Sequence, residues 1–196
     1  SATEDDVIAS WLPVYHDMGL IACFIMPILM GQTIVMLDPF HWVIRPATLF
    51  RAIADHQATL CWMPNFAFDH LVNLVRPDPA SMNLESMRAF INCSEPCRAE
   101  TFARFAGSFA SLGVQPEKLQ VCYAMAETVF AVSQSEVGSA PRVVSVDKQT
   151  LQEEMCAVPV KPGRADVCLL SNGRPLAGAA VAIKDPNGTT LGDGRV

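Results

Sequence analysis

The sequence predicts an α/β fold: a βαβ layered sheet with helices, followed by a smaller antiparallel β portion. Three observations support this prediction. Apolar runs of strand length recur along the first two thirds of the chain, segments of helix length separate them, and after about Gln134 short strand signals alternate with Pro and Gly. We therefore expect two portions, an α/β portion over residues 1–134 and a β-rich portion over residues 135–196.

The strands expected in the first portion are the apolar runs at residues 7–12, 33–37, 59–63, 87–92 and 119–123. Two of the helices between them are predicted by apolar residues at helical spacing after a proline, which is common at a helix start. One follows Pro46 and the other follows Pro96; their expected core faces are Leu49, Ala52 and Ile53, and Phe102, Phe105, Ala106 and Phe109. An aromatic binding stripe is the alternative for the second set, and packing against a sheet is the simpler explanation.

Residues 18–37 are apolar enough to suggest a membrane-spanning helix, because only Gln32 and Thr33 are clearly polar. Pro27 interrupts that segment, residues 31–33 have the composition of a turn, and residues 34–37 are typical of a strand. We therefore expect a buried helix, a turn and a buried strand, and no membrane span.

The second portion carries short strand signals at residues 143–146, 167–170 and 181–184. Asp147 is a suitable N-cap for one short helix over residues 147–154, and Asn187 followed by Gly is a favoured hairpin turn. Together these signals predict antiparallel β structure.

Composition excludes several classes of function. The 196 residues are 51% hydrophobic, enough for one sizeable core, and the net charge of −6 with scattered Arg and Lys gives no basic face for a nucleic acid. The seven Cys form no C-x-x-C pair, and the four His have no zinc spacing. No signal-peptide pattern or G-x-S-x-G hydrolase motif occurs. Reduced thiols in a cytoplasmic protein fit best, with Cys93 and Cys97 as small buried side chains.

The hexapeptide at residues 123–128 groups an aromatic ring, a carboxylate and a hydroxyl just past a predicted strand. Catalytic groups of open α/β sheets gather at that end of the strands. Tyr123 could stack on a purine, Glu127 could hold magnesium through oxygen, and Thr128 could bond a phosphate. The alternative is a core Tyr followed by an ordinary turn.

Two further motifs precede the hexapeptide, Ser-Trp-Leu-Pro-Val-Tyr-His-Asp-Met-Gly-Leu-Ile at residues 10–21 and Asn-Cys-Ser-Glu-Pro at residues 92–96. With these motifs in this order, the chain resembles the adenylate-forming (acyl-activating) enzymes, and among them the fatty acyl-AMP ligases. Additional likeness lies in residues 64–68 and 171–175. The resemblance extends from about residue 7 to the last residue, and it implies part of the large N-terminal domain of such an enzyme.

The resemblance implies ATP and magnesium as cofactors and assigns roles to particular residues. His16 would be catalytic, near the carboxylate and phosphate, and Glu127 would bind magnesium. Nucleotide-binding roles would fall on Asn92, Ser94, Glu95, Pro96, Tyr123, Ala124, Met125, Ala126 and Thr128, and an acyl pocket would be lined by Met18, Gly19, Phe66 and Phe68.

Each of these roles has a structural alternative. Glu95 could belong to an acidic surface turn, His16 could be a satisfied structural side chain, and core packing could explain the four acyl-pocket residues. Asp17 could orient His16 or cap the following helix, and the cap is favoured. Ala124 stands where the family commonly has Gly, and Cys93 and Ser94 replace a common Gly and Ala, so we expect a less close approach of backbone to nucleotide.

The family's phosphate loop would precede Val7, and its ribose-binding Asp and catalytic Lys would follow Val196, so an internal piece of a larger enzyme is expected. The parent would make fatty acyl-AMP and pyrophosphate from a fatty acid and ATP, then pass the acyl group to an acyl carrier protein. Coenzyme A as acceptor is one alternative. The other is that the isolated chain is a non-catalytic adenylate-binding scaffold, so whether it is itself an enzyme stays open.

Overall fold

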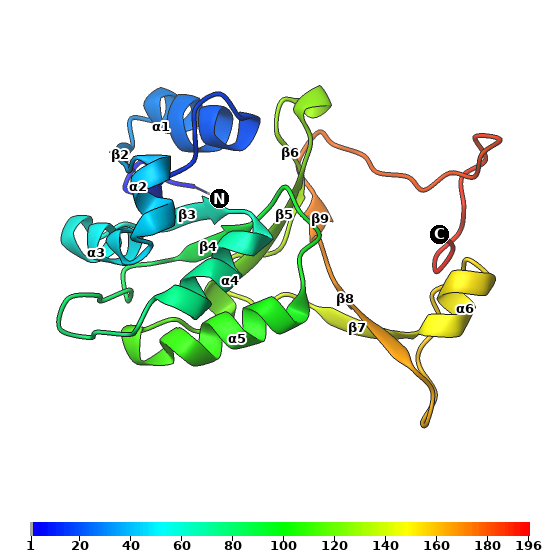
Figure 1. Ribbon diagram of the computed structural model, residues 1–196. Coiled ribbons are helices and arrows are strands. Elements are labelled where there is room, and N and C mark those ends of the chain that lie inside the picture. Colours follow the sequence, from blue (N-terminus) through cyan, green and yellow to red (C-terminus); the bar gives the residue numbers. More distant parts are fainter. Residues whose placement is uncertain (1) are drawn as a thin grey trace.

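A mostly parallel seven-stranded sheet forms the centre of the computed structural model, which describes residues 2–196 (Figure 1). Its strand order is β2-β1-β3-β4-β5-β6-β9. The parallel strands are β1 (Val7–Ser10), β2 (Thr33–Met36), β3 (Leu60–Met63), β4 (Ala89–Asn92) and β5 (Leu119–Ala124). The five strands expected in the first portion are therefore confirmed.

Two antiparallel strands extend the sheet, β6 (Ala131–Gln134) beside β5 and β9 (Arg174–Pro175) beside β6. The sequence did not predict either strand, because each is short and lies beside Pro, Gly or polar residues that resemble loop. The expectation that the strand within residues 18–37 is buried was wrong for β2. It is an edge strand with exposed ends and a half-buried middle, not a buried strand, because only β1 pairs with it in the described sheet.

Helices cover both faces of the sheet. The segment after β1 forms a π-helix, η1 (Met18–Ile25), and a short α1 (Met26–Leu29); η1 lies against β1 and β3. On the other face lie α3 (Ala47–His56), α4 (Asn65–Leu74) and α5 (Ala99–Phe109), with α2 (Pro39–Ile44) beside α3 (Figure 1). The remaining short helices of the first portion are η2 (Ala110–Leu112), η3 (Pro116–Lys118) and η4 (Ala126–Thr128).

The helix expected within residues 18–37 is thus a π-helix that passes into a short α-helix. Pro27 is the second residue of α1, at the point where the π-helix passes into the α-helix. Within residues 2–196 no helix is both long enough and apolar enough to cross a bilayer.

An aromatic cluster between the sheet and α3–α5 forms the centre of the core. Phe50, Phe90, Phe105 and Phe109 are fully buried, and their rings meet edge to face, with centroids 4.8 Å apart for Phe50 and Phe109. Such pairs add about 0.5–1.5 kcal/mol beyond burial. The Phe series after Pro96 is therefore a core face and not a binding stripe.

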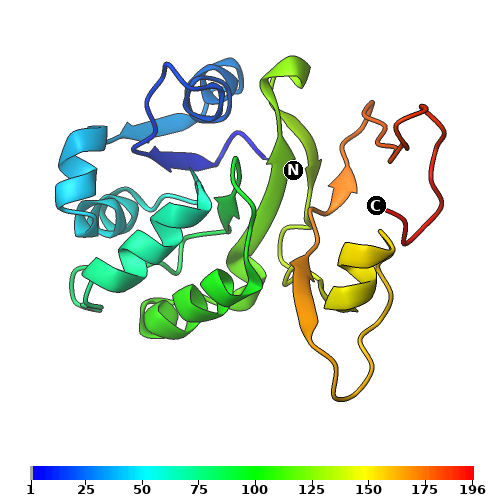
Figure 2. The ribbon, with the colours of Figure 1, turned by 45° about the vertical axis from the view of Figure 1, so that its right-hand side comes forward.

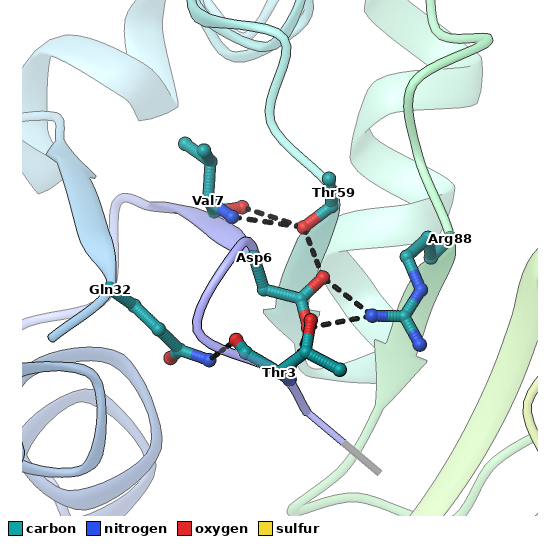
Figure 3. Close-up of polar contacts among 6 residues, drawn as sticks. All are labelled: Thr3, Asp6, Val7, Gln32, Thr59 and Arg88. Carbon is teal, nitrogen blue, oxygen red and sulfur yellow. Dashed lines mark hydrogen bonds and ion pairs between the residues drawn. The ribbon is translucent and has the colours of Figure 1, made fainter. Parts of the chain in front are cut away.

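A buried carboxylate ties together the beginnings of three parallel strands (Figure 3). Asp6, just before β1, accepts hydrogen bonds from the Thr59 hydroxyl at 2.7 Å and the Thr3 N–H at 2.8 Å. Arg88, just before β4, lies 2.7 Å from both carboxylate oxygens. Burial alone raises the pKa of Asp6, but the Thr59, Thr3 and Arg88 contacts together hold that pKa below its ordinary value.

The second portion begins with an antiparallel pair, β7 (Val143–Asp147) and β8 (Asp166–Leu170), with α6 (Lys148–Glu153) between them. Asp147 caps α6, as expected, by accepting from the Thr150 N–H at 2.8 Å. Figure 2 shows this ribbon and helix beside the β6–β9 end of the sheet.

The strand expected over residues 181–184 was wrong. Only an isolated bridge joins Lys184 to Thr190, and Val181 and Ile183 are about half exposed, because no neighbouring strand pairs with this segment among the described residues. The turn at Asn187 is present between the bridged residues, and Gly188 takes the positive φ of 84° that this turn requires.

Candidate active site

The motif segments meet at one edge of the sheet because parallel strands place their carboxyl ends together. The His16 segment follows β1. Residues 92–96 begin at the last residue of β4, and Tyr123 is the last residue but one of β5. β4 and β5 are neighbours, whereas β3 separates β1 from β4 and carries residues 64–68 at its own end. Four strand ends therefore supply the site.

A cavity of about 460 Å³ lies between the segment after β4, the end of β5 and the strand β8. It brings together five residues with a predicted nucleotide-binding role: Ser94, Glu95, Pro96, Tyr123 and Ala124. Tyr123 is 47% exposed and lines this cavity. The other predicted nucleotide residues, Asn92, Met125, Ala126 and Thr128, do not line this cavity.

Sequence reasoning missed the remaining lining residues, which are Cys97, Cys122, Cys168, Leu169, Leu170 and Asn172. The last four come from β8 and the residue pair after it, so they belong to the second portion. Asn172 lies in the 171–175 segment quoted for the resemblance, which was the available signal. Burial raises the pKa of the Cys97 thiol to about 12, so this side chain is a neutral thiol at pH 7 and not a nucleophilic thiolate.

The segment after β4 has one strained residue. Ser94 has a φ of 70°, in the left-handed region, whereas Cys93 keeps a negative φ and is fully buried. The left-handed conformation costs a non-glycine residue about 1–2 kcal/mol. The Ser94 hydroxyl lies 3.8 Å from the Met18 sulfur, so the nucleotide segment and a predicted acyl-pocket residue are in contact.

Asn92 and Glu95 bind the start of α4. Asn92 is fully buried, and its Nδ2 donates to Asn65 Oδ1 at 2.9 Å. Glu95 is exposed at the cavity, and its carboxylate accepts the Phe66 N–H at 2.8 Å. Glu95 is therefore more than a surface turn residue, since it caps an open N–H of a helix N-terminus.

Beyond Tyr123 the chain makes the tight turn η4. The Thr128 hydroxyl lies 3.0 Å from the Met125 carbonyl oxygen and stabilises this turn, while the exposed Glu127 carboxylate has no partner among residues 2–196. Val129 follows with a φ of 73°. Because β-branched residues rarely take this conformation, the turn stores strain next to the site.

His16 lies in the exposed segment before η1, with 49% of its side chain accessible. Its Nδ1 lies 2.7 Å from Asp17 Oδ1, and the same carboxylate oxygen accepts the Met18 N–H at 2.8 Å. Asp17 therefore both caps η1 and contacts His16. The Met18 N–H also lies 3.2 Å from His16 Nδ1, whereas Nε2 has no partner among residues 2–196.

The predicted acyl-pocket residues separate into two groups. Phe66 is 47% exposed and meets Trp11 edge to face, with centroids 6.0 Å apart, whereas Phe68 is fully buried between Phe102 and Phe105. Core packing, the alternative, accounts for the position of Phe68, and its place in the acyl pocket stays a prediction. Met18 is 1% exposed.

Gly19 is required by packing. A Cβ at this position would lie 2.3 Å from the Pro13 carbonyl oxygen, so no larger residue fits without a backbone shift. The close approach of η1 to Pro13 fixes where the preceding His16 segment lies.

The cavity lining carries almost no charge. Its lining contains no Lys or Arg, and Glu95 is its one charged residue. A purine base, which is planar and uncharged, suits such a cavity, whereas a triphosphate does not. Within the described chain no three His, Cys, Asp or Glu residues are grouped as a metal site.

Comparisons with known proteins found similar sequences over nearly the whole chain. The family model described as AMP-binding enzyme matches residues 1–196. The long-chain-fatty-acid–AMP ligase FadD26 of Mycobacterium marinum is 32% identical over 94% of this chain and 33% of its own length. FadD32 of Mycolicibacterium smegmatis, a ligase of the same kind, is 32% identical over 98% of the chain and 32% of its own length.

Solved structures match the fold closely. A structure from work on fatty acyl-adenylate ligases of E. coli and L. pneumophila has a TM-score of 0.94 at 27% identity, over 97% of this chain and 35% of that one. The L. pneumophila enzyme in complex with acyl adenylate and pyrophosphate has a TM-score of 0.88 at 31% identity, over 94% of this chain and 32% of that one. The chain thus spans about a third of the length of these relatives.

Proposed function

This chain belongs to the AMP-binding enzyme family, and from that premise we propose that its parent protein is an ATP-dependent fatty acid ligase that makes fatty acyl-AMP. In this reaction a fatty carboxylate oxygen attacks the α-phosphate of ATP, the bond to the β-phosphate breaks, and pyrophosphate leaves. The printed names of the relatives, fatty-acid–AMP ligases, support this substrate class.

The observation that carries the proposal is the cavity between Tyr123 and the segment after β4. Tyr123 is exposed and lines this cavity, so its ring would stack on the adenine base. Ser94, Glu95, Pro96 and Ala124 would form the walls around the base. Asn92 does not line the cavity; through its bond to Asn65 it would hold the segment after β4 in place.

Magnesium fits the residues present. Glu127 offers an exposed carboxylate without a protein partner among residues 2–196, and Mg²⁺ is commonly held by one or two carboxylates together with substrate phosphates. Bound there, magnesium would neutralise phosphate charge as pyrophosphate leaves. Thr128, whose hydroxyl donates to the Met125 carbonyl oxygen of the same turn, would position Glu127 through η4.

His16 is proposed to donate a hydrogen bond from Nε2 to the developing negative charge. Asp17, 2.7 Å from Nδ1, orients the ring for that purpose. Met18, which contacts Ser94, and Phe66, whose N–H is held by Glu95, are proposed to line the acyl pocket beside the nucleotide.

We propose a carrier-protein thiol as the acyl acceptor, with coenzyme A as the alternative. One relative supports the first, the medium-chain-fatty-acid–[acyl-carrier-protein] ligase JamA of Moorena producens, 29% identical over 94% of this chain and 32% of its own length. The seven cysteines are all free, which supports a reducing compartment such as the cytoplasm.

The proposal is tested on the full-length parent protein. Incubation with a fatty acid, ATP and magnesium is expected to yield fatty acyl-AMP and one equivalent of pyrophosphate, measured by mass spectrometry and a coupled phosphate assay. Addition of a holo acyl carrier protein should then consume the acyl-AMP, and addition of coenzyme A should not. Hydrolysis of ATP to ADP without acyl-AMP would exclude the proposed reaction, and transfer to coenzyme A alone would select the alternative acceptor.

A further inference from the structure

One side chain that does not line the cavity makes hydrogen bonds to both ends of the cavity-lining segment after β4. Asn65, the first residue of α4, is 7% exposed. Its Oδ1 accepts from Asn92 Nδ2 at 2.9 Å and from the Arg98 backbone N–H at 3.2 Å. Asn92 ends β4 and Arg98 immediately precedes α5, so a single oxygen closes the wall segment, residues 93–97, at both ends.

The next residue of α4 holds the middle of the same wall segment. The Phe66 N–H donates to the Glu95 carboxylate at 2.8 Å. The first two residues of α4 thus contact the wall segment at its beginning, centre and end. Phe66 is also a proposed acyl-pocket residue, so the same helix turn supports both substrate regions.

A hydrogen-bond chain fixes the orientation of the Asn65 amide. Its Nδ2 donates to the Thr101 hydroxyl at 3.3 Å, and that hydroxyl donates to Asp69 at 3.1 Å. Asp69 is in turn paired with Arg104 at 2.8 Å. Because Thr101 uses its proton on Asp69, it presents a lone pair to Asn65 and thereby keeps Oδ1 directed at the wall segment.

We propose that Asn65 is a positioning residue that holds the wall segment in its ligand-binding conformation. This role rests on the proposed function, since it concerns the adenine wall of that site. Asn65 does not line the cavity and acts through Asn92 and Arg98. The wall needs such support, because Ser94 at its centre takes a left-handed φ of 70° that a released segment would relax.

The role predicts which atom of Asn65 matters. Asn65→Ala removes the acceptor and leaves both flanks unsatisfied, whereas Asn65→Asp keeps an oxygen at the Oδ1 position and places its second oxygen beside Thr101, whose hydroxyl can turn from Asp69 to donate to it. Asn73→Ala is the matched control. Asn73 lies on the same helix and accepts from Arg104 at 2.9 Å, and it has no bond to the wall segment.

The test is a calorimetric titration of each form of the 196-residue chain with a non-hydrolysable fatty acyl-adenylate analogue and magnesium, beside hydrogen exchange of residues 93–98. Asn65→Ala should bind the analogue about tenfold more weakly, as loss of two hydrogen bonds implies, and exchange faster at residues 93–98. Asn65→Asp should bind within about threefold of the natural chain, and Asn73→Ala should match it. If Asn65→Ala does not fold, Asn65→Leu takes its place, because leucine fills the site but has no hydrogen-bond acceptor.

The outcomes separate the two proposals. Binding by the natural chain with equal binding by the alanine or leucine variant overturns the positioning role and leaves the proposed function standing. Equal weakening by the aspartate variant and the Asn73 control also overturns it, because a general loss of helix stability would then explain the data. A natural chain that folds and does not bind the analogue overturns the positioning role in this chain, whereas the proposed reaction is overturned only by the assay of the full-length parent protein.

Discussion

At the scale of single residues, the site depends on atoms that sequence patterns identify only in part. Tyr123 and the residues 94–96 are recognisable from a short motif, and they do line one cavity. Asn65 lies in one of the quoted segments, residues 64–68, but its bond to Arg98, like the place of Cys168 in the cavity lining, depends on contacts between segments far apart in the chain. Phe68, which is fully buried, stays open to both interpretations, since an aromatic residue near a motif is equally consistent with a core position.

Gly19 provides a prediction at this scale. Gly19→Ala should lower the free energy of unfolding by about 1–3 kcal/mol, because its Cβ would meet the Pro13 carbonyl oxygen, a backbone atom that yields only if η1 shifts. Urea unfolding measures the change. Gly107→Ala is the control: Gly107 lies in α5 with open space around its Cβ position, so alanine should raise stability by about 0.5–1 kcal/mol. Equal effects of the two substitutions would contradict the packing argument.

At the scale of elements, strong apolar runs predicted the five parallel strands because buried strands of such sheets are continuously hydrophobic. The same signal failed at residues 181–184, where no partner strand lies beside the segment, and it missed β6 and β9, whose pairing is set by tertiary contacts. The π-helical winding of η1 is likewise not encoded in apolar spacing, which does not distinguish it from an α-helix.

The network that joins the starts of β1, β3 and β4 yields a prediction of pH dependence. The folded pKa of Asp6 lies below its ordinary value of 3.8, so its stabilising contribution is complete above pH 3.8 and is lost as the pH falls through the folded pKa. Asp6→Asn should therefore lower the free energy of unfolding by about 2 kcal/mol at pH 7, as expected for hydrogen bonds to a charged group, and by progressively less below about pH 4.

Urea unfolding at a series of pH values measures this dependence. Asp55→Asn is the matched control, because Asp55 is exposed on α3 and has no partner among residues 2–196. It should leave the pH profile unchanged. A gap between the natural chain and Asp6→Asn that stayed constant from pH 7 to pH 3 would show that the carboxylate charge contributes nothing.

At the scale of the whole molecule, the two portions expected from the sequence are joined more closely than the change in composition indicates. β9, from the second portion, extends the central sheet beside β6, and β8 supplies the far wall of the cavity. The proposed nucleotide site therefore needs both portions. The sequence predicted the sheet edge at which the site lies, and only the tertiary structure identified its third wall.

The central claim is that this chain carries a formed adenine slot. The most direct test is calorimetric titration of the folded chain with the acyl-adenylate analogue and magnesium, beside Tyr123→Ala, Tyr123→Phe and His16→Ala. Saturable binding that Tyr123→Ala weakens by about tenfold or more, and that Tyr123→Phe preserves, is the predicted result, since stacking on a base contributes about 1–3 kcal/mol. Unchanged affinity in Tyr123→Ala, or no binding by the folded natural chain, would contradict the claim.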